Sequence, residues 1–322
     1  MAADERLSDV GEFGFLARML PTLPQGPEVA LGPGDDAAVL DLGGARVVVC
    51  TDVLVEGSHF RLDWTGGHEV GRKAAAVNMA DVAAMGARTV ALLAGVAAPG
   101  DLDAAWLTAL AQGLAEESGR VGASIVGGDI VAGEQIGVTV TAVGVLDGPL
   151  VTRAGALPGD TVAVCGRLGY AAAGLAVLQR GFRSPRALVD AQRCPDPPYA
   201  AGPAAAALGA HAMIDVSDGL LADLGHVARQ SDVGVRIDPD LVPVADQLEQ
   251  MARGLGVDVR SWVFGGGEDH ALVACFPPAV ALPPAWTSIG TVVQGSGVQV
   301  ERWEAMPDGL SGTDGGFDHF AR

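Results

Sequence analysis

The sequence predicts a mixed α+β protein of two domains, and three observations support this class. At 322 residues the chain exceeds the usual size of one domain, and its 49% hydrophobic content suits a well-packed globular protein. Strand-like and helix-like segments alternate through the first half. The pattern restarts after a turn at 147–149, which places the domain boundary near residue 150 and the domains at 1–150 and 151–322.

In the first half, short apolar runs and alternating residues indicate strands, and alanine-rich stretches indicate helices. The expected elements are a buried strand at 47–50 that ends at Thr51-Asp52, a helix at 68–85 closed by Gly86, a helix at about 101–118 with Asp101 as N-cap, and a strand at 136–146.

The second half has the same kinds of signal, and no short-period repeat is visible. The expected elements are a strand at 161–165, a helix at about 169–180, a proline-rich connection at 194–203, a strand at 212–216, a helix at about 219–231, a glycine turn at 265–267 and a strand at 271–276.

Composition excludes several classes of protein. The net charge is −19 and Lys73 is the single lysine, which argues against a nucleic-acid-binding surface. The N-terminus has no basic start followed by an apolar core, and no eighteen-residue apolar run occurs. The four cysteines form no Cys-x-x-Cys pair and no secreted disulfide framework. We therefore expect a soluble cytoplasmic protein with reduced thiols and no membrane partner.

The usual nucleotide-binding signatures are absent from the chain. A P-loop needs a glycine-lysine pair followed by serine or threonine, whereas Lys73 lies between Arg72 and Ala74. No Gly-x-Gly-x-x-Gly opens a helix after a strand. The sequence therefore argues against a Walker-type or a Rossmann nucleotide-binding site.

The chain offers instead six short motifs in which aspartate lies beside small residues. Carboxylate oxygens suit hard cations such as Mg²⁺, which also bridge to phosphate oxygens, so that a polyphosphate could bind without a lysine cradle. Each motif alone is more often an ordinary turn, but six together favour a cluster. The motifs are 34–38 (Gly-Asp-Asp-Ala-Ala), Thr51-Asp52, 78–81 (Asn-Met-Ala-Asp), 127–129 (Gly-Gly-Asp), 215–219 (Asp-Val-Ser-Asp-Gly) and 266–269 (Gly-Gly-Glu-Asp).

Two of these motifs allow a local test. On the helix at 68–85, Asn78, Asp81 and Met85 fall on one stripe that can face a site, although Asp81 could equally face water. In the segment that begins at Asp215, Ser217 or Asp218 could be only a helix N-cap. An EF-hand fails there, because position 5 would be Gly219 and position 12 would be His226. The six histidines show no zinc spacing, and His59 alone lies in a conspicuous motif.

In this order and at these intervals, the motifs resemble those of the thiamine-monophosphate kinases, members of an ATP-binding superfamily that includes aminoimidazole ribonucleotide synthetase. The resemblance runs from Gly11-Glu12-Phe13 to 316–320 (Gly-Phe-Asp-His-Phe), nearly the whole chain. Its most specific segments are 32–37 (Gly-Pro-Gly-Asp-Asp-Ala), Thr51-Asp52 with 55–60 (Val-Glu-Gly-Ser-His-Phe), 78–87 (Asn-Met-Ala-Asp-Val-Ala-Ala-Met-Gly-Ala) and 215–220 (Asp-Val-Ser-Asp-Gly-Leu).

The resemblance implies a homodimer whose N-terminal domains pair strands into a shared β-barrel, C-terminal α/β sandwich domains, and active sites in clefts between the two kinds of domain. It implies ATP and thiamine monophosphate as substrates and several Mg²⁺ ions. The metal ligands it implies are Asp36, Cys50 (through its backbone), Thr51, Asp52, Asp81, Asp129, Asp215 and Asp218.

The same resemblance implies nucleotide contacts at Gly128, Asp129, Arg153 and Ser217. It places the thiamine-phosphate pocket at His59, Glu268 and Phe317. Asp81, Asp129, Asp218 and Arg153 are the expected catalytic residues.

Three positions depart from the family pattern. Cys50 stands where serine is common, Ile130 replaces threonine after Gly-Gly-Asp, and His270-Ala271 replaces Tyr-Glu after Glu268-Asp269. The first bears only on a backbone-type metal contact, and the last could change the shape of the pocket near the substrate.

The expected reaction is direct in-line transfer of the ATP γ-phosphoryl group, because an ionised phosphate monoester needs positioning and charge neutralisation more than a general base. In this reaction Arg153 would assist at phosphate oxygens, and Glu268 and Phe317 would lie near the thiazolium or pyrimidine.

The nearest alternatives are another enzyme of the superfamily, such as aminoimidazole ribonucleotide synthetase or selenophosphate synthetase, and an inert Mg²⁺- or Ca²⁺-binding scaffold. The motifs at 55–60 and 316–320 argue against the first, and the number of separately placed motifs argues against the second.

Overall fold

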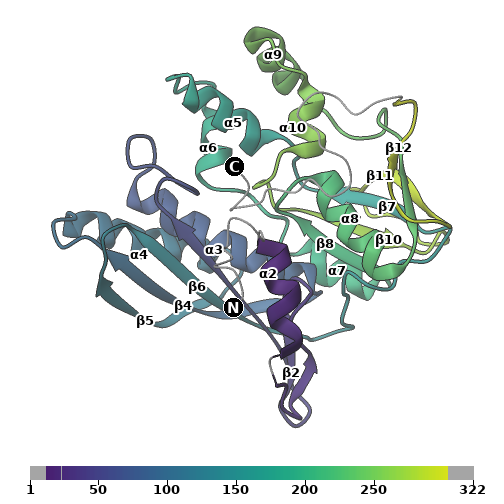
Figure 1. Ribbon diagram of the computed structural model, residues 1–322, viewed down its shortest axis with the longest axis horizontal. Coiled ribbons are helices and arrows are strands. Elements are labelled where there is room, and N and C mark those ends of the chain that lie inside the picture. Colours follow the sequence, from purple (N-terminus) through teal and green to yellow (C-terminus); the bar gives the residue numbers. More distant parts are fainter. Residues whose placement is uncertain (1–11, 23, 304–322) are drawn as a thin grey trace, which may run out of the picture.

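Two six-stranded sheets organise the protein, whose computed structural model describes residues 12–22 and 24–303 (Figure 1). The first sheet has the order β1 (Val29–Leu31), β2 (Ala38–Asp41), β3 (Arg46–Val55), β6 (Gly137–Val145), β4 (Arg88–Ala98), β5 (Ser124–Ala132). The second has the order β12 (Gly297–Val300), β9 (Gly234–Ile237), β11 (Thr287–Val293), β7 (Thr161–Cys165), β10 (Ala271–Phe276), β8 (Ala212–Val216).

Both sheets are mixed in strand direction. Neighbouring strands are antiparallel except for β4 with β5 in the first sheet and β12 with β9 in the second. The predicted α+β class with two halves is confirmed.

In the first half, helices α3 (Gly67–Ala84) and α4 (Ala104–Gly119) lie together on the sheet (Figure 1). They approach closely because glycines line their contact. A Cβ added at Gly71 would lie 2.1 Å from the Leu110 carbonyl oxygen, and one at Gly113 would lie 2.0 Å from that of His68. The sheet's central strand β6 alternates between buried and half-buried residues, as expected for a strand with one face on the core. The chain before this sheet forms α2 (Glu12–Met19) and a short 3₁₀ turn at Leu20–Thr22.

The helices of the second half surround its sheet (Figure 1). Helix α8 (Leu220–Ser231) packs on β8, and Leu220, Leu224 and Val227 of this helix are buried in the core with the strand residue Ile214. The remaining helices are α5 (Tyr170–Gln179), α6 (Arg186–Arg193), α7 (Ala201–Ala207), α9 (Asp246–Leu255) and α10 (Val259–Gly265).

Helix α3 is the element that joins the two halves. It packs on β3, β4 and β6 of the first sheet and also contacts β8 and β10 of the second and helices α6 and α7. The contact is close at Gly202, where an added Cβ would lie 1.9 Å from the Ala83 carbonyl oxygen. Ala83 and Ala84 share a buried cluster with Met213 and Leu272. One helix thus carries side chains to both domains.

Several element boundaries differ from those predicted. The strand predicted at 47–50 continues as β3 through Thr51 and Asp52 to Val55. The helix predicted at 101–118 begins at Ala104, and its N-cap is Asp103, whose side chain accepts a hydrogen bond from the Ala105 N–H. Asp101 is therefore not the cap. The stretch 194–203 is a connection only in part, because α7 begins at Ala201.

Candidate active site

Four aspartates from separate segments form a carboxylate cluster between the two halves. Asp36 precedes β2, Asp52 is in β3, Asp81 is in the last turn of α3, and Asp215 is in β8. Burial first, and then the charges of the other three, raise the pKa of the Asp81 carboxyl well above its ordinary value. The half-buried Asp81 is therefore one of a group of like charges, which favours the interpretation that this side of α3 faces a site. Met85 of that stripe is buried in the core instead.

Asp36 is the most constrained member of the cluster. Burial raises its pKa to about 8; Arg153 opposes this shift, and the charges of Asp215 and Asp35 add to it. The Arg153 guanidinium donates hydrogen bonds to Asp36 Oδ1, and the Arg153 N–H donates to Asp35 Oδ2 at 2.9 Å. Asp36 Oδ2 is buried and has no hydrogen-bond partner among residues 12–22 and 24–303. A buried carboxylate oxygen without a donor is a position where a cation fits.

Strand β3 and helix α3 are tied together beside the cluster. Asn78 Oδ1 accepts the Asp52 N–H at 3.0 Å, while Asn78 Nδ2 donates to the Ala74 carbonyl oxygen at 2.9 Å. The Cys50 thiol donates to the Asn78 carbonyl oxygen at 3.3 Å. Burial, followed by the charges of Asp81 and Asp52, raises the pKa of this thiol well above its usual value. A protonated thiol is not a Mg²⁺ ligand, so only the backbone of Cys50 suits the predicted role.

Thr51 lies on β3 between Cys50 and Asp52, so its side chain is on the face of the sheet opposite to the side chains of those two residues. Its hydroxyl donates to the Val140 carbonyl oxygen at 2.9 Å and accepts from Thr141 Oγ1 at 3.1 Å. The structure does not bring this hydroxyl into the carboxylate cluster. A metal contact of Thr51 would have to use its backbone.

The second half contributes Asp215 from the end of β8. Its Oδ2 lies 2.7 Å from His270 Nδ1, and both side chains are buried. His270 follows the glycine turn before β10 and has a left-handed backbone, with φ of +52°. This histidine was seen in the sequence only as a departure from the family pattern. Its contact with a predicted metal ligand is a feature that sequence reasoning missed.

A second residue that the sequence did not reveal, Asp223, stabilises the turn between Asp215 and α8. Asp223 Oδ2 accepts the N–H groups of Asp218 and Gly219 at 3.1 and 3.0 Å, and the Asp223 side chain is buried. Burial, then the charges of Asp218 and Asp215, raises the pKa of Asp223 well above its usual range. Asp218 is thus oriented by Asp223 and is not itself the helix N-cap, which is Gly219. An Asp four residues into a helix is a weak sequence signal for this role.

Gly128 and Asp129 lie on β5, which is separated from β3 by strands β6 and β4. Pairing places Gly128 opposite Ala94, Ala94 opposite Val140, and Val140 opposite Asp52, so that these residues form one row across the sheet. A Cβ at Gly128 would lie 2.1 Å from the Ala94 carbonyl oxygen. The Asp129 side chain is exposed. Among the described residues Asp129 belongs to the next row, with Gly95, Thr139 and Val53, and it lies outside the cluster.

The predicted substrate residues come from both halves. His59 follows β3, and its Nδ1 accepts the Val55 N–H at 3.0 Å. Glu268 lies in the glycine turn, where its N–H donates to the Ser217 carbonyl oxygen at 2.8 Å. Lys73 of α3 connects the two, since its Nζ lies 2.7 Å from Glu268 Oε1 and 3.0 Å from the His59 carbonyl oxygen. Phe317 lies outside the described residues.

The residues present fit divalent ions that bind together with a polyphosphate. Within the described ranges, no three His, Cys, Asp or Glu side chains converge tightly enough to hold an ion alone. Mg²⁺ is commonly held by one or two carboxylates, with waters and phosphate oxygens completing its octahedron. The mutual repulsion within the carboxylate cluster and the orphaned Asp36 Oδ2 are both relieved by cations.

Both halves of the chain are similar to known proteins. The AIR synthase related protein models match in both halves, the N-terminal domain over residues 34–146 and the C-terminal domain over 158–301. A thiamine-monophosphate kinase of Mycobacterium tuberculosis (strain ATCC 25618 / H37Rv) is 50% identical over 304 residues, which cover 92% of this chain and 90% of that protein. The chain belongs to the thiamine-monophosphate kinase family.

Other members of the thiamine-monophosphate kinase family are similar over most of their length. The Corynebacterium glutamicum kinase is 41% identical over 271 residues, 81% of each chain. Among solved structures, AaThiL complexed with AMPPCP and TMP superposes with a TM-score of 0.89 at 31% identity, covering 99% of this chain and all of that one. This family member therefore has the same fold as the solved AaThiL structure.

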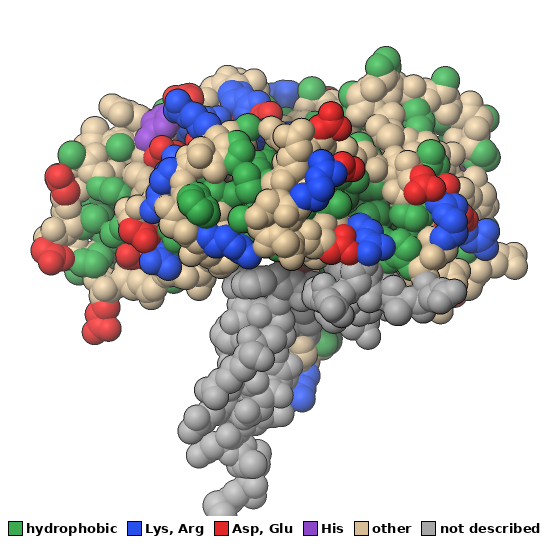
Figure 2. Space-filling view, turned by 90° about the horizontal axis from the view of Figure 1, so that it is seen from above, with side chains coloured by type: hydrophobic (Ala, Val, Ile, Leu, Met, Phe, Trp, Pro, Cys, Tyr) green, Lys and Arg blue, Asp and Glu red, His purple; other side chains and the backbone are tan. Residues whose placement is uncertain are grey.

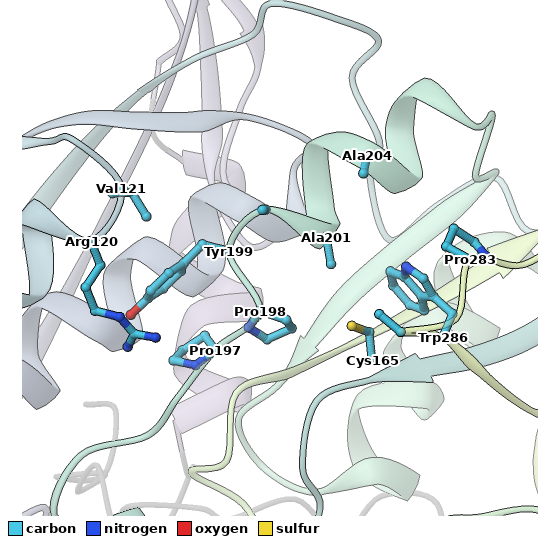
Figure 3. Close-up of a pocket in the computed structure, with 12 residues that line it drawn as sticks. Arg120, Val121, Cys165, Pro197, Pro198, Tyr199, Ala201, Ala204, Pro283 and Trp286 are labelled. Carbon is cyan, nitrogen blue, oxygen red and sulfur yellow. The ribbon is translucent and has the colours of Figure 1, made fainter.

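An apolar cavity of about 520 Å³ lies elsewhere in this thiamine-monophosphate kinase family member. Figure 3 shows Tyr199 and Arg120 on one side of it and Trp286 with Cys165 on the other. None of the predicted site residues lines this cavity.

Proposed function

We propose that this protein is a Mg²⁺-dependent kinase that phosphorylates thiamine monophosphate to thiamine diphosphate, with ATP as phosphoryl donor. The observation that carries the proposal is the carboxylate cluster of Asp36, Asp52, Asp81 and Asp215, with Asp36 Oδ2 orphaned. Support also comes from AaThiL, which is complexed with AMPPCP, an ATP analogue, and with TMP. Two anionic phosphate groups could not approach such a cluster unless cations came with them.

The reaction is a direct in-line transfer. A phosphate oxygen of thiamine monophosphate forms a bond to the γ-phosphorus, while the bond from that phosphorus to the bridging oxygen breaks and ADP leaves with the electron pair. The attacking oxygen is already ionised at neutral pH, so the chain needs no general base. The task of the protein is to hold the two phosphates in line and to offset their charge.

In this proposal the aspartates hold the metal ions, which when bound supply positive charge between the phosphates. The proposed ligands are Asp36, Asp52, Asp81, Asp129, Asp215 and Asp218, with Cys50 and Thr51 contributing through their backbones. Arg153 binds Asp36 through its guanidinium and Asp35 through its backbone N–H, and in this proposal the guanidinium also assists at phosphate oxygens. Gly128, Asp129 and Ser217 complete the nucleotide contacts. His59, Glu268 and Phe317 form the thiamine-phosphate pocket.

We further propose that the protein is a homodimer in which the first sheets of two protomers pair into a barrel. Strand β5 supports this, because it lies at an edge of its sheet and all nine of its residues are exposed. Val126, Ile130 and Val131 on it are 60%, 64% and 54% exposed, an apolar strand of the kind that is normally covered. Residues 1–150 would then form the ATP-, Mg²⁺-binding and dimerisation domain, and 151–322 the synthetase-like domain.

The expected cellular setting is the cytoplasm, with no nucleic acid or membrane partner. All four cysteines are unpaired, as in a reducing compartment. On the face shown in Figure 2, basic side chains, which are arginines because the single lysine is buried, lie among Asp and Glu side chains and form no continuous basic surface. No helix in the described part of the chain has the length and apolar character needed to cross a bilayer.

The decisive experiment incubates the purified protein with thiamine monophosphate, ATP and Mg²⁺ and follows thiamine diphosphate and ADP by chromatography. We expect both products in equal amounts, no products with EDTA, and almost none with Asp81→Asn. Binding of ATP without thiamine diphosphate formation would reject this acceptor and favour another enzyme of the superfamily. Metal binding without any ATP turnover would favour the inert scaffold. A phosphorylated enzyme that is chased into product would exclude direct transfer.

A further inference from the structure

Lys73, the single lysine of the chain, makes contacts that neither the predicted chemistry nor the comparisons use. It lies in α3 and its side chain is 1% exposed. Its Nζ lies 2.7 Å from Glu268 Oε1, 3.0 Å from the His59 carbonyl oxygen and 3.4 Å from that of Gln192. An ammonium has three N–H donors, so these three acceptors account for all of them.

The three acceptors belong to segments that are far apart in sequence. His59 follows β3 in the first half, Gln192 is in α6, and Glu268 is in the glycine turn of the second half. The buried ammonium is therefore a junction between the halves. Burying a charge costs free energy unless the charge is paired and hydrogen-bonded, and here it is both.

Glu268 is held from two directions. Its backbone has φ of +66°, and its N–H donates to the Ser217 carbonyl oxygen at 2.8 Å. A Cβ added at the preceding residue, Gly267, would lie 2.2 Å from that same oxygen, so the turn fits closely against the Asp215–Gly219 segment. Lys73 then fixes the side chain. The Glu268 side chain is nevertheless 35% exposed, so that part of the carboxylate stays open to a ligand.

His59 is held in a similar way. Its ring Nδ1 accepts the Val55 N–H at 3.0 Å and its carbonyl oxygen accepts from Lys73. One ammonium thus determines the separation between the His59 segment and the Glu268 carboxylate. These are two of the residues that the proposed function places at the acceptor.

We propose that Lys73 is a positioning residue for the acceptor substrate. It does not touch thiamine monophosphate; it holds Glu268 and the His59 segment at the spacing that the acceptor requires, and it offsets the Glu268 charge. This inference rests on the proposed function, because it concerns the pocket for that acceptor. None of the three acceptors of Lys73 is a proposed metal ligand or nucleotide contact, so Lys73 acts on acceptor binding more than on ATP binding.

The test compares Lys73→Met, Lys73→Arg and Glu268→Gln. Methionine keeps the length of the side chain and removes the charge. The fold is retained, because the partly exposed Glu268 carboxylate can then be solvated. We expect Lys73→Met to raise KM for thiamine monophosphate about tenfold or more, with KM for ATP and kcat each changed less than about threefold. Arg88→Met is the matched control, because Arg88 is an exposed cation paired with Asp147. It should leave all three constants unchanged.

A double-mutant cycle tests the route of the effect. If Lys73 acts through Glu268, the Lys73→Met and Glu268→Gln effects on KM overlap and the double variant is scarcely worse than the more affected single variant. Fully additive effects would overturn that route. Lys73→Arg should restore part of the affinity, since arginine keeps the charge but not the three-donor geometry.

A readout that needs no turnover separates this inference from the proposed function. Lysine labelled with ¹⁵N at Nζ gives one side-chain signal in this chain, and thiamine monophosphate should shift that signal in the wild-type protein. Calorimetry should show weaker binding of thiamine monophosphate to Lys73→Met. A wild-type protein that binds no thiamine monophosphate rejects the proposed function and this inference together. Wild type and Lys73→Met that bind it equally well, or an unmoved Nζ signal on binding, reject only the role of Lys73.

Discussion

His270 Nδ1 lies 2.7 Å from Asp215 Oδ2 in a pair whose side chains are both buried. Burial opposes the charged imidazole, but the hydrogen bond and charge of Asp215 outweigh it and raise the pKa of His270 overall. The contact holds one oxygen of Asp215 in place. The other oxygen is thereby oriented for a further ligand, as outer hydrogen bonds commonly orient metal-binding carboxylates.

Replacing His270 with asparagine is therefore expected to weaken the apparent affinity for Mg²⁺ by about tenfold, the usual scale for losing such an outer contact. Asparagine tolerates the left-handed backbone at this position, so the effect reports the side chain. Mg²⁺ titrations of both activity and melting temperature measure it. His68→Asn is the control, because His68 pairs with Glu116 at an exposed position. An unchanged Mg²⁺ dependence would refute the orienting role.

Asp81→Asn and Asp218→Asn are expected to lower kcat by about a hundredfold or more at saturating Mg²⁺, because each removes a charged ligand whose effect is electrostatic. Asp81→Asn should also raise the melting temperature in EDTA, since it relieves repulsion from Asp52, Asp215 and Asp36. Asp101→Asn, at an exposed site, is the control. Near-normal kcat values would show that neither side chain binds the ions.

Asp269 predicts a pH-dependent stability effect. Burial raises its pKa to about 7, although the Ala171 and Gly169 N–H groups oppose this shift. Its folded-state pKa is thus above the ordinary value, so ionisation destabilises the fold at high pH and protonation stabilises it as the pH falls through 7. Asp269→Asn imitates the protonated acid and keeps an acceptor for the Ala171 N–H. The melting temperature of this variant minus that of wild type should be positive and larger at pH 8 than at pH 5.

Asp258→Asn is the control for this pH effect. The Arg260 side-chain hydrogen bond lowers the Asp258 pKa, so this carboxylate is ionised in both folded and unfolded chains from pH 5 to 8. Its replacement should lower the melting temperature by a similar amount at both pH values. An Asp269→Asn difference that also stays constant would show that Asp269 is ionised throughout.

The crossing of α3 and α4 predicts a large cost for one added methyl group. Gly71→Ala would place a Cβ 2.1 Å from the Leu110 carbonyl oxygen, so the helices must separate. We expect a loss of about 1–3 kcal/mol or more in the free energy of unfolding, measured by denaturant titration. Gly254→Ala is the control, because nothing lies within 4 Å of its added Cβ in α9, and it should be neutral or stabilising. Equal effects would mean that the crossing is not tight.

Much of the fold could be predicted from the sequence where hydrophobic periodicity is strong. The strands at 161–165, 212–216 and 271–276 match β7, β8 and β10 residue for residue. Strands β4 and β5 were not predicted, because alanine and glycine, which favour strands weakly, interrupt the larger apolar residues in both. Asp52 looked like a strand end since it is charged, but Asn78 from α3 accepts its N–H and the strand continues. That partner is 26 residues away and leaves no local signal.

The candidate site could also be predicted only in part. Aspartates beside glycine were recognisable as candidates, and the structure brings Asp36, Asp52, Asp81 and Asp215 together. The contacts that orient them were not recognisable, because His270 and Asp223 act through tertiary packing. Lys73 was noticed only as evidence against a P-loop. Its three acceptors come from three segments, and no sequence pattern predicts such a meeting.

Helix α3 carries residues at both ends of the proposed site, and this limits the length of the acceptors that fit. Lys73 and Asp81 are eight residues apart in α3, a rise of about 12 Å along the axis. The helix is pinned to both sheets, so this length cannot adjust to the molecule that is bound. If these residues act as proposed, an acceptor must be long enough to reach the aspartates with its phosphate while its ring system lies near Glu268. Shorter phosphate esters would be rejected by molecular length alone, whatever their affinity for the metal ions.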